Sequence, residues 1–97
     1  MLVVPSQESS SSLVIFPNPA KVSFTINFNA GYSSQQPYTL AVQDMAGRIL
    51  LMHEGTLADG SLIEDISLTD ALSGGTYFVV ITTNGKQYRE RLLLIGK

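Results

Sequence analysis

From Val22 to Phe28, apolar and polar side chains alternate without a break. Successive side chains of a β-strand point to opposite faces of the sheet. The pattern is therefore typical of a strand with one buried face and one solvated face. An amphipathic helix would instead repeat its apolar residues every three or four positions. The segment predicts a half-buried β-strand rather than a helix.

Six more short segments are rich in the β-branched, aromatic and other apolar residues found in half-buried strands. They span residues 13–16, 38–42, 48–54, 62–68, 77–83 and 86–95. Between them, Asp44–Gly47, Asp59-Gly60 and Asn84-Gly85 supply the residues that tight turns need. About seven short strands with turn signals every 8–12 residues or so predict an all-β antiparallel sandwich. A small closed barrel is the alternative architecture.

Three segments are less regular. Ile49–Met52 is apolar on both faces, so we expect this strand to be covered on both sides. Glu64 falls on the same, more apolar strand face as Leu62 and Ile66, where a carboxylate is unexpected. Residues 69–75 are too few for a stable helix, and we expect them to form a single turn.

The N-terminal residues differ in composition from the rest. Ser9 to Ser12 are four consecutive serines with no apolar group to bury, so residues 1–12 are expected to be a flexible linker. Residues 13–97 are then one domain, large enough for one modest core. Met1–Pro5 is apolar but too short for a signal peptide, so, if the domain is exported, its export signal is expected elsewhere in a longer parent. No apolar run is long enough to span a membrane as a helix.

The charge of the chain is low and unevenly distributed. Charged residues make up 14% of the 97 residues and the net charge is −2, which argues against nucleic acid as a partner. Residues 86–97 carry four basic and one acidic side chain, a net charge of +3. Residues 1–85 carry two basic and seven acidic side chains, a net charge of −5. The basic end is either a strand beside acidic loops or a tip that a partner recognises.

No group of residues supports catalysis. Without cysteine, the chain can form no disulfide, zinc–thiolate site or thiol nucleophile. We expect a structural or surface role for the single histidine, His53, because nothing points to a Ser-His-Asp triad. Asp44, Asp59 and Asp70 lie in predicted turns without the Asp-x-Asp-x-Asp spacing of a calcium loop. We therefore expect no enzyme activity, metal or cofactor.

Several of these features occur in one characteristic order along the chain. They are Phe16-Pro17-Asn18-Pro19-Ala20, the segment 42–49, Ile66-Ser67-Leu68, the segment 72–79, and Leu92–Lys97. This ordered set resembles the type A C-terminal sorting domain of the type IX secretion system, or Por secretion system, of Bacteroidetes. The resemblance covers about residues 14–97.

The resemblance implies an immunoglobulin-like sandwich that acts as a non-catalytic secretion signal. Such a domain follows an upstream cargo domain and is read by the outer-membrane translocon and shuttle proteins of the system. A sortase-like cysteine protease commonly cuts in the preceding linker, and some cargo is then attached to the cell surface. The implied location is the periplasm in transit to the outer membrane surface or the exterior.

The resemblance also assigns candidate residues by position. The sorting-motif and recognition candidates are Pro17, Asn18, Pro19, Asp44, Gly47, Gly75, Tyr77, Arg89, Arg91, Leu92, Leu94 and Lys97. The candidates for the cleaved linker are Ser9, Ser10, Ser11 and Ser12. We expect folding roles for most internal motif residues and a recognition role for the C-terminal strand.

A carbohydrate-binding or adhesion module of a surface protein is the alternative function. Sugar sites usually present exposed aromatic side chains, and this chain has no tryptophan. Tyr32, Tyr38 and Tyr88 are the tyrosines expected to be exposed. A tyrosine-dependent glycan interaction would favour this second interpretation.

Overall fold

The computed structural model describes residues 11–21, 23–31, 35–67 and 74–95, and the regular structure there is entirely β-strand. The strands are β1 (Ser12–Phe16), β2 (Ser23–Asn29), β3 (Pro37–Gln43), β4 (Ile49–Thr56), β5 (Ser61–Ser67), β6 (Gly75–Thr83) and β7 (Lys86–Leu94). All seven segments predicted from the sequence form strands, with ends displaced by one or two residues.

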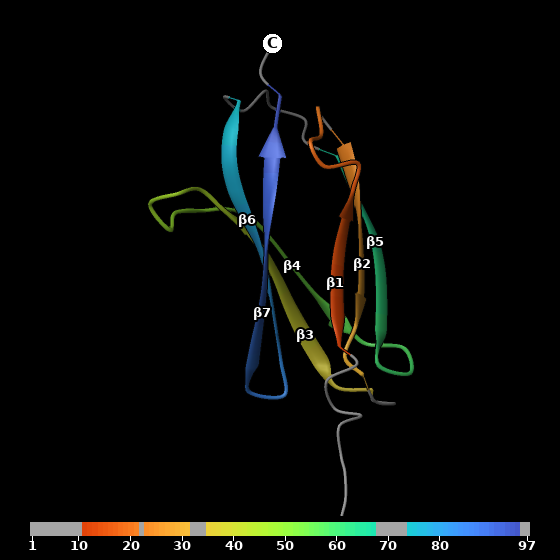
Figure 1. Ribbon diagram of the computed structural model, residues 1–97. Helices are drawn as coiled ribbons and strands as arrows, with labels where there is room; N and C mark the ends of the chain where they lie inside the picture. The colour runs from red at the N-terminus through yellow and green to blue at the C-terminus, as the bar shows by residue number, and fades with distance from the viewer. Residues whose placement is uncertain (1–10, 22, 32–34, 68–73, 96–97) are drawn as a thin grey trace, which may run out of the picture.

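Two antiparallel sheets pack face to face (Figure 1). One has the strand order β1-β2-β5 and the other the order β4-β3-β6-β7. Each sheet keeps its own edge strands, so the prediction of an immunoglobulin-like sandwich is confirmed and the closed barrel is excluded. At the front of Figure 1, β1 of the smaller sheet lies next to β7 of the larger one.

The core lies between the sheets and is built mainly from alternate side chains of the strands, together with Leu57, which follows β4. The largest fully buried side chains are Phe28, Ile26, Leu40, Leu57, Ile66, Ile81, Leu92, Val42 and Val79. Burial of each contributes roughly 1.5–3 kcal/mol relative to exposure. The alternation of apolar and polar residues in the sequence thus arises because each strand buries one of its two faces.

Two tight turns form where the sequence predicts them. Asn84 and Gly85 have φ angles of 53° and 77°, and Asp59 and Gly60 have φ angles of 55° and 79°. Two consecutive positive φ angles are the mark of a type I′ turn, whose twist matches that of the strands it joins. The Asn84-Gly85 turn joins β6 to β7 and fixes their register, whereas the Asp59-Gly60 turn closes the isolated bridge between Ala58 and Ser61, where the chain passes from one sheet to the other.

The expectation that Ile49–Met52 is covered on both sides is wrong. Strand β4 is an edge strand, and the side chains of Ile49 and Met52 are each 49% exposed on the outer face. The register between β3 and β4 shifts at Val42/Gln43, which leaves one extra residue in β4. Because of this bulge, the successive residues Leu50 and Leu51 both pack against the core.

Glu64 points inward, as its place in the alternation indicates, and has polar partners there. Its Oε2 lies 3.3 Å from Nδ1 of His53 on β4, so the pair joins the edge strands of the two sheets. The hydroxyl of Tyr38 also hydrogen-bonds to Glu64. Burial above all, and then the Glu64 charge and hydrogen bond, raise the pKa of Tyr38. His53 and Glu64 thus form a polar contact at the margin of the core.

The expected exposure of Tyr38 is also wrong, since this residue is only 8% exposed. Tyr88 is half-buried and meets Phe28 edge to face, with ring centroids 4.8 Å apart. Tyr32 lies outside the described residues, as do residues 69–73 of the expected turn. The described part of the chain holds no helix with the length and hydrophobicity needed to cross a bilayer.

Candidate functional site

After β1, the segment Phe16–Ala20 crosses from the smaller sheet to the free edge of β7. There the side chain of Asn18 bonds to the β7 backbone at two points. Its Nδ2 donates to the carbonyl oxygen of Arg91 at 2.8 Å, and its Oδ1 accepts from the N–H of Leu93 at 2.9 Å. A side-chain amide carries the same donor and acceptor as a peptide group. Asn18 therefore pairs with β7 as a neighbouring strand would.

Ala20 continues this pairing with its own backbone. Its N–H donates to the Leu93 carbonyl and its carbonyl accepts from the N–H of Ile95, both at 2.8 Å. The contact is a parallel bridge centred on Leu94, and Ala20 is only 1% exposed. We call the segment Pro17–Ala20 the clasp. Its four hydrogen bonds hold the C-terminal part of β7.

The two prolines of the clasp suit an edge position because neither has a backbone N–H to satisfy. The peptide bonds Phe16–Pro17 and Asn18–Pro19 are both cis. Both prolines are exposed, and the polar groups that reach β7 come from the residues between and after them. The segment thus lies along the edge of β7, a partner strand that the sequence did not indicate.

Strand β7 presents different chemistry on its two faces. Leu92 and Leu94 point into the core, with exposed fractions of 0% and 6%. Leu92 pairs with Tyr77 of β6, which is 8% exposed, and Leu94 pairs with Gly75. These four residues are motif candidates, and their described contacts lie within the fold.

Arg89 and Arg91 occupy the opposite, outer face of β7. Both are exposed, and the Arg89 guanidinium lies over the ring of Phe78, 4.6 Å from its centroid. Neither arginine forms a salt bridge with any carboxylate in the part of the chain that the structure describes. Their charge is therefore available to a partner.

The first half of β7 also has an open edge. The strand pairs with β6 on one side, and the clasp reaches only from Arg91 to Ile95 on the other. Residues 86–90 have no strand on that side among the described residues. An unpaired edge offers backbone donors and acceptors to another chain.

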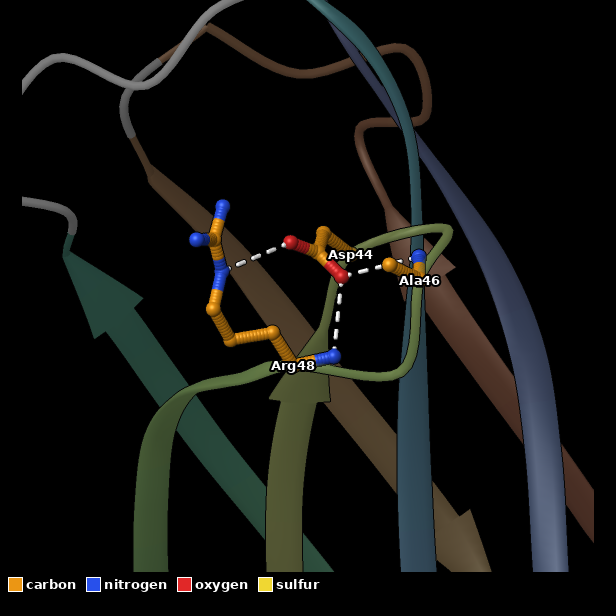
Figure 2. A network of polar contacts seen from close by, with 3 residues as sticks. All are labelled: Asp44, Ala46 and Arg48. Atoms are coloured by element: carbon orange, nitrogen blue, oxygen red, sulfur yellow. Dashed lines mark hydrogen bonds and ion pairs between the residues drawn. The ribbon is translucent and has the colours of Figure 1, made fainter.

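Asp44 and Gly47 build the turn between β3 and β4 (Figure 2). The Asp44 Oδ1 accepts hydrogen bonds from the backbone N–H groups of Ala46 and Arg48, each at 2.9 Å. Its Oδ2 meets Nε of Arg48 at 3.0 Å. The hydrogen bond from the Arg48 backbone, followed by that from Ala46 and the guanidinium charge, lowers the pKa of Asp44. Gly47 has a φ of +87°, a conformation that favours glycine.

The structure thus groups the candidate residues into two sets. The clasp, Gly75, Tyr77 and the residues of β7 meet at one edge of the sandwich, whereas Asp44 and Gly47 form a separate turn. Lys97, Ser9 and Ser10 lie outside the described residues. Ser11 precedes β1, and Ser12 is the first residue of β1, paired with Asn29, so the sheet begins one residue before the expected domain boundary.

Two residues at this site were missed by the sequence analysis. Ala20 pairs with β7, and Phe78 lies under Arg89. The Asn84-Gly85 turn was the signal for Phe78, because a two-residue hairpin fixes the register and places Phe78 opposite Arg91. Nothing in the sequence distinguishes Ala20 from its neighbours as a pairing residue.

Among the described residues, no three histidine, aspartate or glutamate side chains gather as metal ligands would.

The crystal structure of dimeric latent PorU from Porphyromonas gingivalis has a similar fold, with a TM-score of 0.67 and 18% identity. The match covers 90% of this chain but 9% of that protein, and at this identity it shows the fold alone.

No curated protein sequence matches the chain. The model of the secretion system C-terminal sorting domain family matches residues 14–95, which include the clasp, the Asp44–Gly47 turn and β7. The chain belongs to the secretion system C-terminal sorting domain family.

Proposed function

We propose that this domain is a non-catalytic address that directs an upstream cargo protein to the type IX secretion translocon for export across the outer membrane. The family supports a sorting signal of that system and hence export toward the outer membrane or cell surface. The observation that carries the proposal is that β7 is held in the fold on one face and exposed on the other. One face anchors the strand in the core, the clasp holds part of its edge, and two arginines that pair with no described carboxylate remain on the surface.

In this proposal the sorting-motif candidates divide by role. The clasp and the residues Gly75, Tyr77, Leu92 and Leu94 keep β7 in place. Arg89, Arg91 and the chain end at Lys97 meet the shuttle proteins and the translocon. A sortase-like cysteine protease then cuts in the serine segment before β1, and surface attachment of the cargo can follow.

Export of a reporter tests the proposal. A periplasm-targeted fluorescent protein is fused in front of residue 1 and expressed in a type IX-competent host and in a translocon-deficient strain. We expect the reporter on the surface or in the medium only in the competent host. Retention of a stable fusion in the periplasm of the competent host would refute the function.

A second fusion tests the role of the chain end. Deletion of all residues from Leu92 onward would remove two buried leucines and so would test folding rather than recognition. Deletion of Gly96 and Lys97 alone removes none of the described contacts. We expect this shorter fusion to keep its thermal stability and lose export, and unchanged export would show that the terminal lysine is not read.

A further inference from the structure

The outer face of the four-stranded sheet carries an exposed apolar surface next to the two arginines. We call this surface the arginine-flanked patch. It consists of Ile49 and Met52 of β4, Phe78 of β6, and Arg89, Arg91 and Leu93 of β7. Ile49 and Met52 are each 49% exposed and Leu93 is 37% exposed, which are high values for such side chains on a sheet face.

Strand register places the patch residues in adjacent rows. Gln43 pairs with Ile49 on one side and with Phe78 on the other, and Phe78 pairs with Arg91. Residues two apart on a strand are about 7 Å apart along it. The next row therefore lies close by, on the same face.

That second row runs from Met52 through Ala41 and Val80 to Arg89. Ala41 and Val80 are only 5% and 6% exposed, so neighbouring side chains cover the apolar centre of this row. Met52 lies at one end of the row and Arg89 at the other. The patch thus has exposed apolar side chains on both sides of Gln43 and is basic along the β7 side.

The two arginines have no counterion among the residues that the structure describes. They lie two residues apart on one face of an edge strand, and no described carboxylate is within salt-bridge distance of either. A guanidinium presents a planar set of donors that matches a carboxylate, and it keeps its charge at all physiological pH values. Stacking on Phe78 holds Arg89 in place before any partner arrives.

We propose that the arginine-flanked patch docks an acidic surface of the export machinery, one that places carboxylates against Arg89 and Arg91 and apolar side chains over Met52 and Phe78. This inference rests on the proposed function and identifies the surface and the chemistry by which that function is exerted. Charge complementarity carries it, because opposite charges around an apolar centre give orientation and specificity. A second copy fits poorly, since a symmetric dimer would place the same patch on both sides and bring four positive charges, with no carboxylate from the patch, into one interface.

The fusion described above tests the patch with charge-matched variants. R89Q/R91Q removes two positive charges from the patch. N27E/S67E makes the same change in net charge on the outer face of the smaller sheet, where both residues are exposed. We expect R89Q/R91Q to reduce exported reporter by at least about tenfold, because both charged contacts with the acidic partner are lost. N27E/S67E should export like the parent.

A photocrosslinking amino acid at Met52 identifies the contact directly, with Ile63 as the control position. Ile63 is 69% exposed on the opposite side of the sandwich. During export we expect the Met52 probe to crosslink to one machinery protein within an acidic segment. The adduct should be lost in R89Q/R91Q and kept in N27E/S67E, and the Ile63 probe should not form it.

The outcomes separate the two proposals. Failure of the parent fusion to be exported refutes the proposed function and the patch together. Normal export of R89Q/R91Q, or an adduct that joins two copies of this chain, refutes the patch as the docking surface and leaves the proposed function standing. Because both arginines are exposed, the variant should unfold at the parent temperature. If it does not, M52S with I63S as its control repeats the export test without altering charge.

Discussion

At the scale of the residue, the two hydrogen bonds of the Asn18 side chain explain why an asparagine lies between the two prolines of the motif. One side chain both donates to the Arg91 carbonyl and accepts from the Leu93 N–H. Aspartate has no donor for the Arg91 carbonyl, and serine is shorter. The residue thus supports the fold in a way that bears on function, because it holds the strand that we propose is recognised.

Replacement of Asn18 by alanine should loosen the end of β7 without unfolding the domain. Two hydrogen bonds at an exposed site are lost, and we expect a decrease in the free energy of unfolding of about 1 kcal/mol in urea titrations. The Leu93 amide should exchange with deuterium faster, since its acceptor is gone. Asn27→Ala, on the solvent face of β2, is the matched control.

An Asn18→Ala variant whose Leu93 amide kept its protection would contradict the clasp. So would an Asn27→Ala variant that lost stability and protection to the same extent. Asn18→Asp should be at least as harmful as Asn18→Ala, because it sets a carboxylate oxygen against the Arg91 carbonyl.

The lowered pKa of Asp44 predicts that the stability of the domain depends on pH in the acid range. The pKa of Asp44 is lowered below its ordinary value of 3.8, so the folded state holds the proton less tightly than the unfolded chain. Its stabilisation is therefore fully present above the unfolded pKa and is lost as the pH falls through the folded pKa. Asp44→Asn should unfold at a lower temperature than the parent at pH 7.

Thermal unfolding from pH 7 down to pH 2 measures this effect. The gap between the parent and Asp44→Asn should narrow below about pH 4, where the parent carboxylate begins to gain its proton. A gap that stays constant over that range would show that the Asp44 charge does not support the turn.

At the scale of the element, β7 offers two neighbouring leucines with opposite environments. Leu92 is fully buried and Leu93 is 37% exposed. Leu92→Ala should cost about 2–5 kcal/mol of unfolding free energy, because it leaves a cavity in the core. Leu93→Ala should cost about 0.5 kcal/mol or less, as an exposed substitution. Urea titration of the two variants measures the difference, and equal losses would contradict the inward orientation of Leu92.

The strands themselves could be predicted from the sequence because alternation is local. Ser-Phe-Thr-Ile-Asn-Phe in β2 can hide one face only as a strand, and Asn84-Gly85 can take two positive φ angles cheaply. Strand β4 was misjudged because a bulge depends on the partner strand. Four apolar residues in a row look the same whether the strand is central or at an edge with an extra residue.

At the scale of the whole molecule, the pairings between distant segments could not be predicted. Alternation does not show that β2 lies beside β5 or that β3 lies beside β6. The clasp is a similar case, since Asn18 and Arg91 lie 73 residues apart in sequence. For the same reason Glu64 looked misplaced, although its partners His53 and Tyr38 lie on the other sheet.

The contacts that hold β7 in the fold lie apart from the surface that we propose is recognised. Core leucines and the clasp fix β7 from the inside and along its edge, while the arginines and the adjoining apolar side chains stay on the outer face. A variant that weakens the inner contacts should lose export together with stability. A variant that alters the outer face should lose export alone.

The most direct test of this account is the fraction of a surface-accessible reporter delivered by the parent chain and by R89Q/R91Q, each measured beside its unfolding temperature. The account predicts export by the parent, loss of export by the variant, and the same unfolding temperature for both. A stable parent domain that leaves its reporter in the periplasm of a type IX-competent host would contradict it.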